Sequence, residues 1–253
     1  PRFAGDAIAS TRLGQILAIA ERLDTLAGGF AAGLKPSGNK DPFALRRNAL
    51  GLARTLIEGG LDLNLIGMLE AAKAALPAGI DVDANDLYDF ILDRLRGYFA
   101  ERGVGAALFD AVAATQPVSL LDFAARLDAL QRFAALPEAA ALAAANKRAR
   151  NILKKVEGAL RDSIDASKLV EPAERELHAA LVAALADTDA ALAVRDYVAV
   201  LSRLAALRQP VDTFFDSVMV MADDPAIRDN RLALLKALAD RFATVAAIEQ
   251  LAT

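Results

Sequence analysis

The fold is decided by the stretch Arg208-Gln209-Pro210-Val211-Asp212-Thr213-Phe214-Phe215-Asp216-Ser217-Val218-Met219-Val220-Met221, followed by Asp223-Asp224-Pro225-Ala226-Ile227-Arg228-Asp229-Asn230-Arg231-Leu232. It predicts two helices joined by an acidic turn. Proline is tolerated in the first turn of a helix, where its missing N–H has no partner to lose, so both prolines mark helix starts. Asp224 is a suitable N-cap for the second helix. The first helix is strongly apolar and is expected to be buried.

The rest of the chain repeats this helical character. Hydrophobic residues make up 55% of the 253 residues and charged residues 25%, and residues that favour strands are spread thinly. Apolar residues recur at helical spacing in about eleven segments without a fixed repeat. We therefore predict an all-α helical bundle with helices at residues 7–30, 43–58, 61–76, 85–102, 104–114, 119–135, 137–160, 172–186 and 190–207, followed by the pair quoted above.

One segment has the composition of a linker. The segment Leu76-Pro77-Ala78-Gly79-Ile80-Asp81 contains a proline and a glycine and lies between two helical patterns. We place a domain boundary there, which divides the chain into domains of residues 1–80 and 81–253.

Composition restricts the class of function. The chain has no cysteine, so it has no disulfide and no thiolate metal site, and every apolar run is interrupted by charge before it is long enough to cross a membrane. A cytoplasmic protein that does not engage membranes fits this composition. The net charge of −4 argues against a protein that coats nucleic acid indiscriminately, and no DNA partner is expected. Because the chain begins at Pro1, we interpret it as a fragment.

No residue is predicted to be catalytic or to bind a metal. P-loop, dinucleotide-binding, nucleophile-elbow and zinc-protease motifs are absent from the sequence. The single histidine, His178, has no second histidine or cysteine near it and is expected at the surface or its boundary.

The helix expected around residues 146–160 carries the clearest candidate site. At 3.6 residues per turn, Lys147, Arg150, Asn151 and Lys154 fall within roughly 100° of one another, and Arg148 and Lys155 flank them. Apolar residues occupy the opposite side. Cations on one face of an anchored helix suit an RNA backbone, since they displace its counterions. The alternative is an ordinary solvated face of a bundle helix.

Three stretches resemble one known family. They are the quoted pair of helices, Lys35-Pro36-Ser37-Gly38-Asn39-Lys40-Asp41-Pro42-Phe43-Ala44-Leu45-Arg46-Arg47, and Ala143-Ala144-Ala145-Asn146-Lys147-Arg148-Ala149-Arg150-Asn151-Ile152-Leu153. In order and spacing they resemble the C-terminal part of the beta subunit of the tetrameric bacterial glycyl-tRNA synthetases. The resemblance implies the tail of an HD-like helical domain, followed by a helical anticodon-binding domain of the type found in arginyl-tRNA synthetases (the DALR type).

The resemblance also implies what is bound. An anticodon-binding domain for glycine tRNA would read the two cytosines that glycine anticodons share, which requires hydrogen-bond acceptors beside donors. Asp224 with Arg228, Asn230 and Arg231 supplies that mixture at one helix start, and Arg208 is a further candidate. Helix capping and local ion pairing explain the same cluster equally well.

Unstacked bases would also need flat partners. Phe214, Phe215, Tyr197 and Phe133 are the candidates. Core packing is the favoured interpretation for Phe214 and Phe215, and Met219 and Met221 are also expected in the core.

The N-terminal part is less informative. Asp24 resembles the position of a late metal-binding aspartate in HD phosphohydrolases, but without a set of histidines it is interpreted as structural. Lys35, Lys40, Arg46 and Arg47 surround a flexible loop and are candidates for contacts with the tRNA body, with a solvated loop as the alternative.

The prediction is the tRNA-binding region of a glycine–tRNA ligase beta subunit. The resemblance implies glycine tRNA and the alpha subunit as partners in a heterotetramer. It also implies that ATP and magnesium act in the complete ligase, where the alpha subunit forms the adenylate, and that this region holds no cofactor. A non-catalytic helical protein-interaction module is the alternative.

Overall fold

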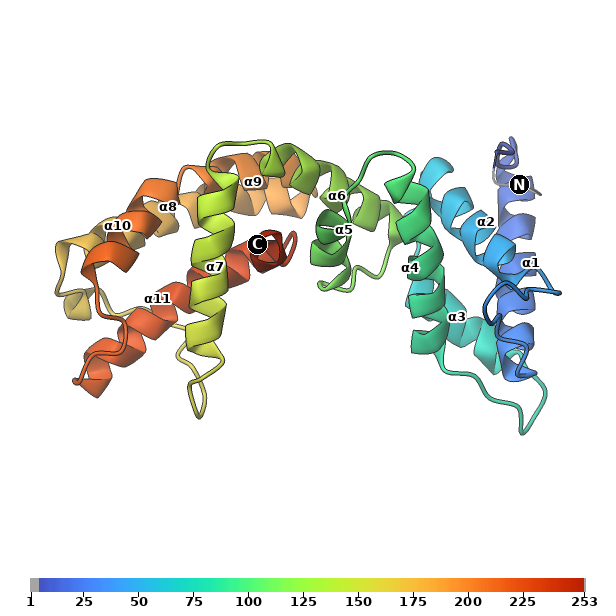
Figure 1. Cartoon of the computed structure of the whole chain (residues 1–253), viewed down its shortest axis with the longest axis horizontal. Helices are drawn as coiled ribbons and strands as arrows, with labels where there is room; N and C mark the ends of the chain where they lie inside the picture. Colours follow the sequence, from blue (N-terminus) through green and yellow to red (C-terminus); the bar gives the residue numbers. More distant parts are fainter. Residues whose placement is uncertain (1–4, 253) are drawn as a thin grey trace. The chain divides into compact units, whose positions relative to one another are not determined.

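The protein is all-α, as predicted. A computed structural model describes residues 5–252, in which eleven α-helices and two 3₁₀ helices follow one another (Figure 1). Within these described residues the only pairing of strand type is an isolated bridge between Ser37 and Lys40. None of the helices in this range combines the length and the apolar character needed to cross a membrane.

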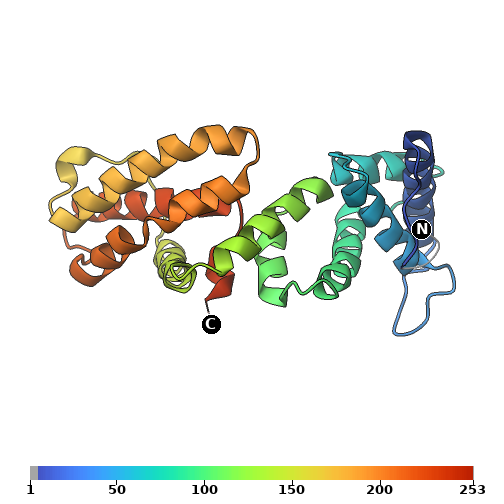
Figure 2. The same cartoon turned by 90° about the horizontal axis from the view of Figure 1, so that it is seen from above.

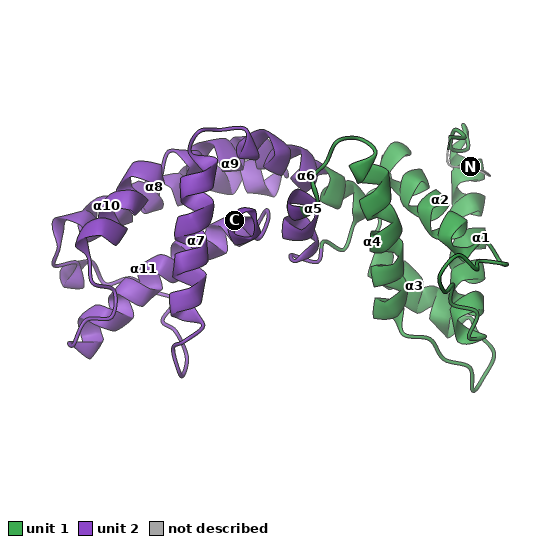
Figure 3. Ribbon diagram, viewed as in Figure 1, with its two compact units in different colours: residues 1–106, 117–124 green, residues 107–116, 125–253 purple. Residues whose placement is uncertain are grey.

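The chain forms two compact units, coloured separately in Figure 3. Unit 1 comprises residues 1–106 and 117–124, and unit 2 comprises residues 107–116 and 125–253, with residues 1–4 and 253 outside the described range. This division does not fall at residue 80, because Leu87, Ile91 and Leu95 of the following helix are fully buried in unit 1. The boundary predicted between residues 80 and 81 separates two domains of the family, and it stays a prediction.

Unit 1 is built from four helices: α1 (Arg12–Ala31), α2 (Leu45–Glu58), α3 (Leu65–Ala74) and α4 (Ala84–Ala100). α2 lies at its centre and packs against both α1 and α4 (Figure 1). All its residues from Gly51 to Leu56 are buried, so this short helix is surrounded on nearly every side. The apolar side chains of α2 therefore hold unit 1 together.

α1 is shorter than predicted and is exposed along its first turns. It begins after Thr11, whose hydroxyl accepts a hydrogen bond from Gly14 N at 3.1 Å and so acts as an N-cap. Its buried apolar residues begin at Ile19, while Leu13, Ile16 and Leu17 are more than half exposed. The helix predicted at residues 7–30 therefore begins later than expected, at Arg12.

Unit 2 contains the remaining helices. They are α5 (Ala106–Ala113), α6 (Leu120–Ala134, which begins in unit 1), α7 (Ala139–Leu153), η1 (Ala166–Lys168), α8 (Pro172–Ala193), α9 (Tyr197–Ala205), α10 (Arg208–Ser217), α11 (Pro225–Ala243) and η2 (Ile248–Leu251). α8 and α9 form a helical hairpin, visible from above in Figure 2, and α7 packs against α10, α11 and η2.

Two helix ends differ from the prediction. α7 stops at Leu153 and not at Leu160, and Gly158 beyond it has a φ of +96°, which an α-helix does not allow. α8 continues through the Asp187-Thr188-Asp189 segment that was expected to end it. Thr188 is accommodated because its hydroxyl donates to Ala184 O at 2.6 Å, within the same helix. The chain turns only at Arg195, whose φ is +58°.

The most consequential difference lies at the end of α10. The helix ends at Ser217, Val218 is extended at φ −109° and ψ 122°, and the chain bends at residues 220 and 221. Side chains of an extended segment alternate between two sides. Val218 and Val220 are accordingly 5% exposed, while Met219 is 76% and Met221 53% exposed. The prediction that both methionines lie in the core was wrong.

A buried ion pair positions this extended segment. Arg231 of α11 and Glu174 of α8 are 6% and 0% exposed and form a salt bridge through Arg231 Nε. Arg231 Nη1 also donates to Met219 O at 2.7 Å, and the second Glu174 oxygen accepts from Glu171 N at 2.7 Å. One guanidinium therefore links α8, α11 and the segment that carries the exposed methionines.

We predict that Arg231→Met destabilises unit 2 by about 3–5 kcal/mol, because it leaves the Glu174 carboxylate buried without its counterion. Adding Glu174→Leu should recover much of that loss, since the pair is then replaced by apolar side chains. Urea unfolding of the single and double variants measures both effects. A single variant as stable as the exposed control Arg132→Met would contradict this role.

A buried tyrosine joins α4 to the segment before α6 within unit 1. Tyr88 is 4% exposed, and its hydroxyl donates to Pro117 O at 2.9 Å. Burial, with a smaller contribution from the charge of Asp89, raises the pKa of Tyr88 to about 12. The phenol therefore stays protonated in the folded protein at a pH where it ionises in the unfolded chain.

The stability contributed by Tyr88 should be fully present below pH about 10, the ordinary tyrosine value. It should be lost as the pH rises toward 12, because the unfolded chain releases the proton first. Subtracting the alkaline ultraviolet titration of Tyr88→Phe from that of the parent should isolate one phenolate with its midpoint near 12. A midpoint near 10 would show that the hydroxyl is solvated.

Candidate nucleic-acid interface

α7 presents an exposed basic surface, which contains every residue of the predicted face and its flanks except Arg150. Within the helix and the turn that follows it, the side chains at the surface are Lys147, Arg148, Asn151, Lys154 and Lys155. We call these five residues the basic strip. Four cations and one amide thus lie along one side of α7, while Leu142, Ala143, Asn146 and Ala149 face the interior.

Arg150 belongs to the edge of this surface and is neutralised. Its guanidinium donates to Ala239 O at 2.9 Å and lies 3.4 Å from an Asp240 oxygen and 3.9 Å from a Glu249 oxygen. Its side chain is 26% exposed. Arg150 thus holds α7 to α11 and η2, and it contributes little positive potential to the strip.

The chain after α11 covers the same edge of α7. Asn146 is 1% exposed and donates to Glu249 at 2.8 Å, and Lys147 Nζ donates to Ala252 O at 3.0 Å. The helical spacing predicted one cationic face. Arg150 is withdrawn from that face by its partners on α11 and η2, and Lys147, although exposed, is bonded to Ala252 O. The rest of the face lies around Asn151.

The exposed methionines lie beside the basic strip. Met219, Met221 and Ile152 line a pocket of about 460 Å³ together with Arg148, which belongs to both surfaces. Methionine is flexible and polarisable, so an exposed pair of methionines can adapt to the flat face of a base. Apolar and cationic side chains therefore meet at one place on unit 2.

Arg148 is held in this position by an aromatic ring. Its guanidinium carbon lies 4.6 Å from the centroid of the Phe215 ring. Phe215 and Phe214 are 9% and 0% exposed and pack edge to face at 5.6 Å, which confirms that they belong to the core. The other aromatic candidates, Tyr197 and Phe133, are 5% and 2% exposed, so none of the four offers a free face for stacking.

The cluster predicted at the start of α11 is divided by the fold. Asp224 caps α11, accepting from Ala226 N at 2.8 Å, and Arg228 beside it is partly exposed. Asn230, by contrast, is fully buried and exchanges two hydrogen bonds with the backbone of Asp165, at 2.7 and 3.0 Å. With Arg231 buried against Glu174, neither residue presents a side chain for a base. Both positions have structural roles that the sequence pattern did not reveal.

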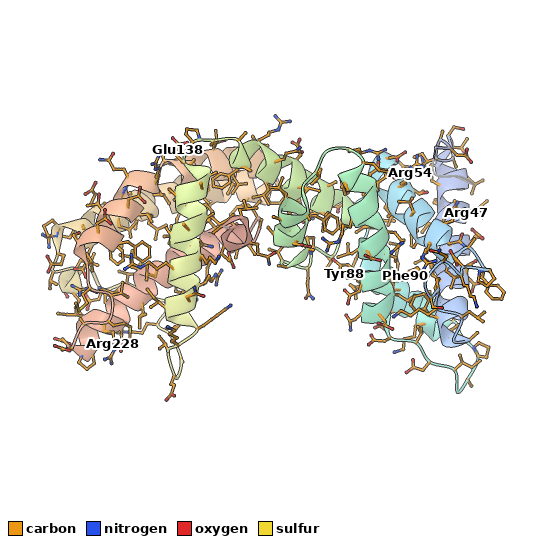
Figure 4. All side chains as sticks on the ribbon, in the orientation of Figure 1. Arg47, Arg54, Tyr88, Phe90, Glu138 and Arg228 are labelled. Carbon is orange, nitrogen blue, oxygen red and sulfur yellow. The ribbon has the colours of Figure 1, made fainter. Side chains whose placement is uncertain are left out.

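Arg228 shares a pocket with residues outside the cluster that was predicted at the start of α11. It lines a pocket of about 250 Å³ with Arg161, from the loop that follows α7, and with Asp229 and Glu157 (Figure 4 labels Arg228). Arg208, at the other end of this region, is 46% exposed and lies 3.5 Å from Asp212 one turn along α10. The structure therefore groups neither Arg208 nor Arg228 with the basic strip.

The four N-terminal candidates lie in unit 1. Lys35 Nζ is 3.0 Å from an Asp86 oxygen and 5.5 Å from the Phe30 ring centroid, while Lys40 is exposed in the loop. Arg46 donates to Gly38 O at 2.8 Å and, with Arg47, lines a separate pocket. As RNA contacts these residues remain a prediction.

Two further observations bear on chemistry. No cluster of three or more metal-binding side chains occurs among the residues that the structure describes, and His178 is partly buried on α8. The exposed methionine pair is the feature that reasoning from the sequence missed. The Val-Met-Val-Met alternation was the available signal, because period two is typical of an extended segment with one buried side.

Comparison with known proteins gives the class of these two units. Residues 1–114 match the family model of the glycyl-tRNA synthetase beta subunit, and residues 142–248 match that of the DALR anticodon-binding domain. The second match contains the basic strip, the methionine pair and α11. The chain is thus of the aminoacyl-tRNA synthetase class and carries a helical anticodon-binding domain.

Curated relatives are similar along the whole chain. The glycine–tRNA ligase beta subunit of Xanthomonas campestris pv. campestris (strain 8004) is 62% identical over 261 residues, covering 100% of this chain and 37% of the relative. Those of Xylella fastidiosa (strain M12) and Leptothrix cholodnii are each 50% identical, covering 99% and 100% of this chain and 39% and 35% of their own lengths. The chain belongs to the glycine–tRNA ligase beta subunit family and spans little more than a third of these relatives.

The exposure of the methionines can be tested without any ligand. We expect dilute hydrogen peroxide to oxidise Met219 and Met221 well before Met68, the remaining methionine, which is partly buried on α3. Peptide mass spectrometry after timed exposure measures the three rates. Equal protection of all three would contradict the exposure of Met219 and Met221.

Proposed function

We propose that this chain is the tRNA-binding part of a glycine–tRNA ligase and that unit 2 binds glycine tRNA at its anticodon. The observation that carries the proposal is the meeting of the basic strip with the methionine-lined pocket at Arg148, inside the region similar to DALR anticodon-binding domains. Single-stranded RNA is bound by this combination in general, because cations follow the backbone while apolar side chains contact unstacked bases.

The arrangement assigns separate tasks to its members. Lys154 and Lys155 are exposed at the end of α7 and would contact phosphates, which position an RNA without reading its sequence. Asn151 and Arg148 offer both an acceptor and donors, which the edge of a cytosine requires. Met219 and Met221 would pack against the faces of the bases. Lys147 and Arg150 contact the C-terminal part of the chain, so they lie at the edge of the surface proposed to bind RNA.

Catalysis is proposed to lie outside this chain. We infer that the ligase reaction, with its ATP and magnesium, is carried out with an alpha subunit as partner in a cytoplasmic heterotetramer. The family membership of the chain supports this inference, together with the absence of any recognisable catalytic motif from its sequence. A protein-interaction module stays the alternative, and tRNA selectivity separates it from the main proposal.

The test removes three cations that form no ion pair among the described residues and leaves the contacts of Lys147 and Arg150 in place: Arg148→Ala, Lys154→Ala and Lys155→Ala together. A single-stranded phosphate contact contributes roughly 0.7 to the slope of log affinity against log salt, so the slope should become less negative by about 2. Fluorescence anisotropy with labelled glycine tRNA over a salt series measures this change.

A matched control removes the same charge from other elements of unit 2: Arg132→Ala on α6, Lys168→Ala on η1 and Arg203→Ala on α9. These cations are exposed or half-buried and pair with nearby carboxylates, so their loss should cost little stability. The control should keep most of the parent's salt dependence. Equal effects of the two triple variants would show that net charge alone matters.

Selectivity is tested with a glycine tRNA in which the two anticodon cytosines are replaced. The tRNA that keeps both cytosines should bind more tightly and should protect Met219 and Met221 from peroxide. The altered tRNA should bind more weakly and should protect the two methionines less. Equal binding and equal protection by both tRNAs would contradict base reading at this surface and favour the protein-interaction alternative.

A further inference from the structure

Unit 1 contains a second cationic site, between α2 and α4, that neither family match assigns. It is a pocket of about 650 Å³ whose walls carry five arginines: Arg46, Arg47 and Arg54 from α2, and Arg94 and Arg102 from α4 and the turn after it. Figure 4 labels Arg47 and Arg54 along α2. The carboxylates that line the same pocket are Asp93 and Glu101. The site is therefore cationic in a chain whose net charge is −4.

Helical periodicity explains how two helices supply these groups. Arg46 and Arg47 lie two turns before Arg54 on α2, and Arg94 lies two turns before Arg102 on the other wall, so each wall carries a guanidinium at both ends. The two helices pack against each other in unit 1. Both walls of the pocket therefore carry guanidinium groups.

The deep end of the pocket is rigid. Arg54 is 6% exposed and donates from Nε to Glu58 at 2.6 Å and from Nη2 to Asp6 O at 2.8 Å. Tyr98 donates to the same Glu58 oxygen at 3.0 Å. The hydrogen bond from Arg54, followed by that from Tyr98, holds the pKa of Glu58 below its usual range despite the opposing effect of burial. Glu58 therefore stays charged and is bonded directly to Arg54, while Arg102 acts on it only through its charge.

Arg102 is pre-organised by Tyr98. Its guanidinium carbon lies 3.5 Å from the Tyr98 ring centroid, and its Nη1 donates to Tyr98 O at 3.0 Å. A guanidinium stacked on a ring keeps the N–H groups of its edge available for an oxyanion. Stacking also reduces the side-chain entropy that binding would otherwise remove.

Arg94 carries an unsatisfied donor. Its Nη2 pairs with Asp93, but its Nε is buried and has no hydrogen-bond partner among the described residues. A buried N–H without an acceptor is costly, and most such groups in folded proteins are paired. An anion in the pocket would supply the missing acceptor.

Gly97 keeps the space open. It lies between Arg94 and Arg102 on the pocket side of α4, and a Cβ added there would meet no atom within 4 Å. A glycine inside a helix costs about 1 kcal/mol relative to alanine, and no packing constraint requires it here. Gly51 on the opposite wall differs, because a Cβ there would come within 2.6 Å of Arg22 Nε. The absence of a side chain at Gly97 leaves room for a ligand.

We propose that this pocket is a phosphate-binding site, which takes the phosphate groups of a nucleotide or of an RNA backbone. Guanidinium groups bind phosphate oxygens through paired, charge-assisted hydrogen bonds, and a converging set of them selects a multiply charged group over a carboxylate or chloride. The site lies in unit 1, so it is a separate function from the anticodon surface proposed for unit 2.

The test titrates the protein with inorganic pyrophosphate, with ADP and with a short single-stranded RNA by calorimetry. Two variants address the pocket: Arg94→Ala with Arg102→Ala, which removes donors, and Gly97→Leu, which fills the space while favouring the helix. Each should weaken pyrophosphate binding at least tenfold without lowering the melting temperature by more than a few degrees. The double variant Arg132→Ala with Arg203→Ala removes the same charge from unit 2 and should leave pyrophosphate binding unchanged.

The three probes distinguish the source of the phosphate. ADP that binds more tightly than pyrophosphate, and is excluded by Gly97→Leu, indicates a nucleotide. RNA binding that falls in both pocket variants, without a preference for ADP, indicates the RNA backbone. The proposal is overturned if pyrophosphate does not bind the parent, or binds all variants alike. The triple variant of the basic strip should bind pyrophosphate normally, so failure of either proposal leaves the other standing.

Discussion

The arrangement of unit 2 depends on one buried charge pair. Arg231 and Glu174 lie in the interior, where removing either partner would leave an ion without compensation, so α8 and α11 are locked in one register. The same guanidinium binds the Met219 carbonyl. It thereby holds in place the segment after α10, in which Met219 and Met221 are exposed to solvent. A residue that looked like a base-reading arginine in the sequence is instead the reason that an apolar pair is exposed beside α7.

α7 shows how a single helix serves packing and binding at once. Its basic residues are divided by the chain that follows α11, since Glu249, Asp240 and the Ala252 carbonyl take up Arg150 and Lys147. What is left exposed is narrower and lies around Asn151. A negatively charged chain can still bind RNA when its cations are arranged in this way, because a local strip attracts the backbone while the net charge limits indiscriminate binding.

The two units use arginine differently. In unit 2 the arginines nearest the candidate surface are mostly committed to the fold, and lysines supply the exposed charge beyond Arg148. In unit 1 five arginines line one pocket. Glu58 holds Arg54, and the Tyr98 ring holds Arg102. Guanidinium groups fixed in this manner suit compact oxyanions, whereas mobile lysines on a convex helix suit an extended backbone. The family resemblance covers both units, but it does not predict this difference.

The sequence by itself determined that the chain is all-α, where most helices begin and which family it resembles, because periodicity, proline positions and caps are local properties. It also determined that Phe214 and Phe215 are buried, since two adjacent rings among valines have few other places. Tertiary structure alone decided which charges are available. Whether Arg150, Asn230 or Arg231 faces solvent depends on partners that are 57 to 90 residues away in the chain, namely Asp240, Asp165 and Glu174. No helical wheel contains that information, because it describes one helix without the neighbours that cover it.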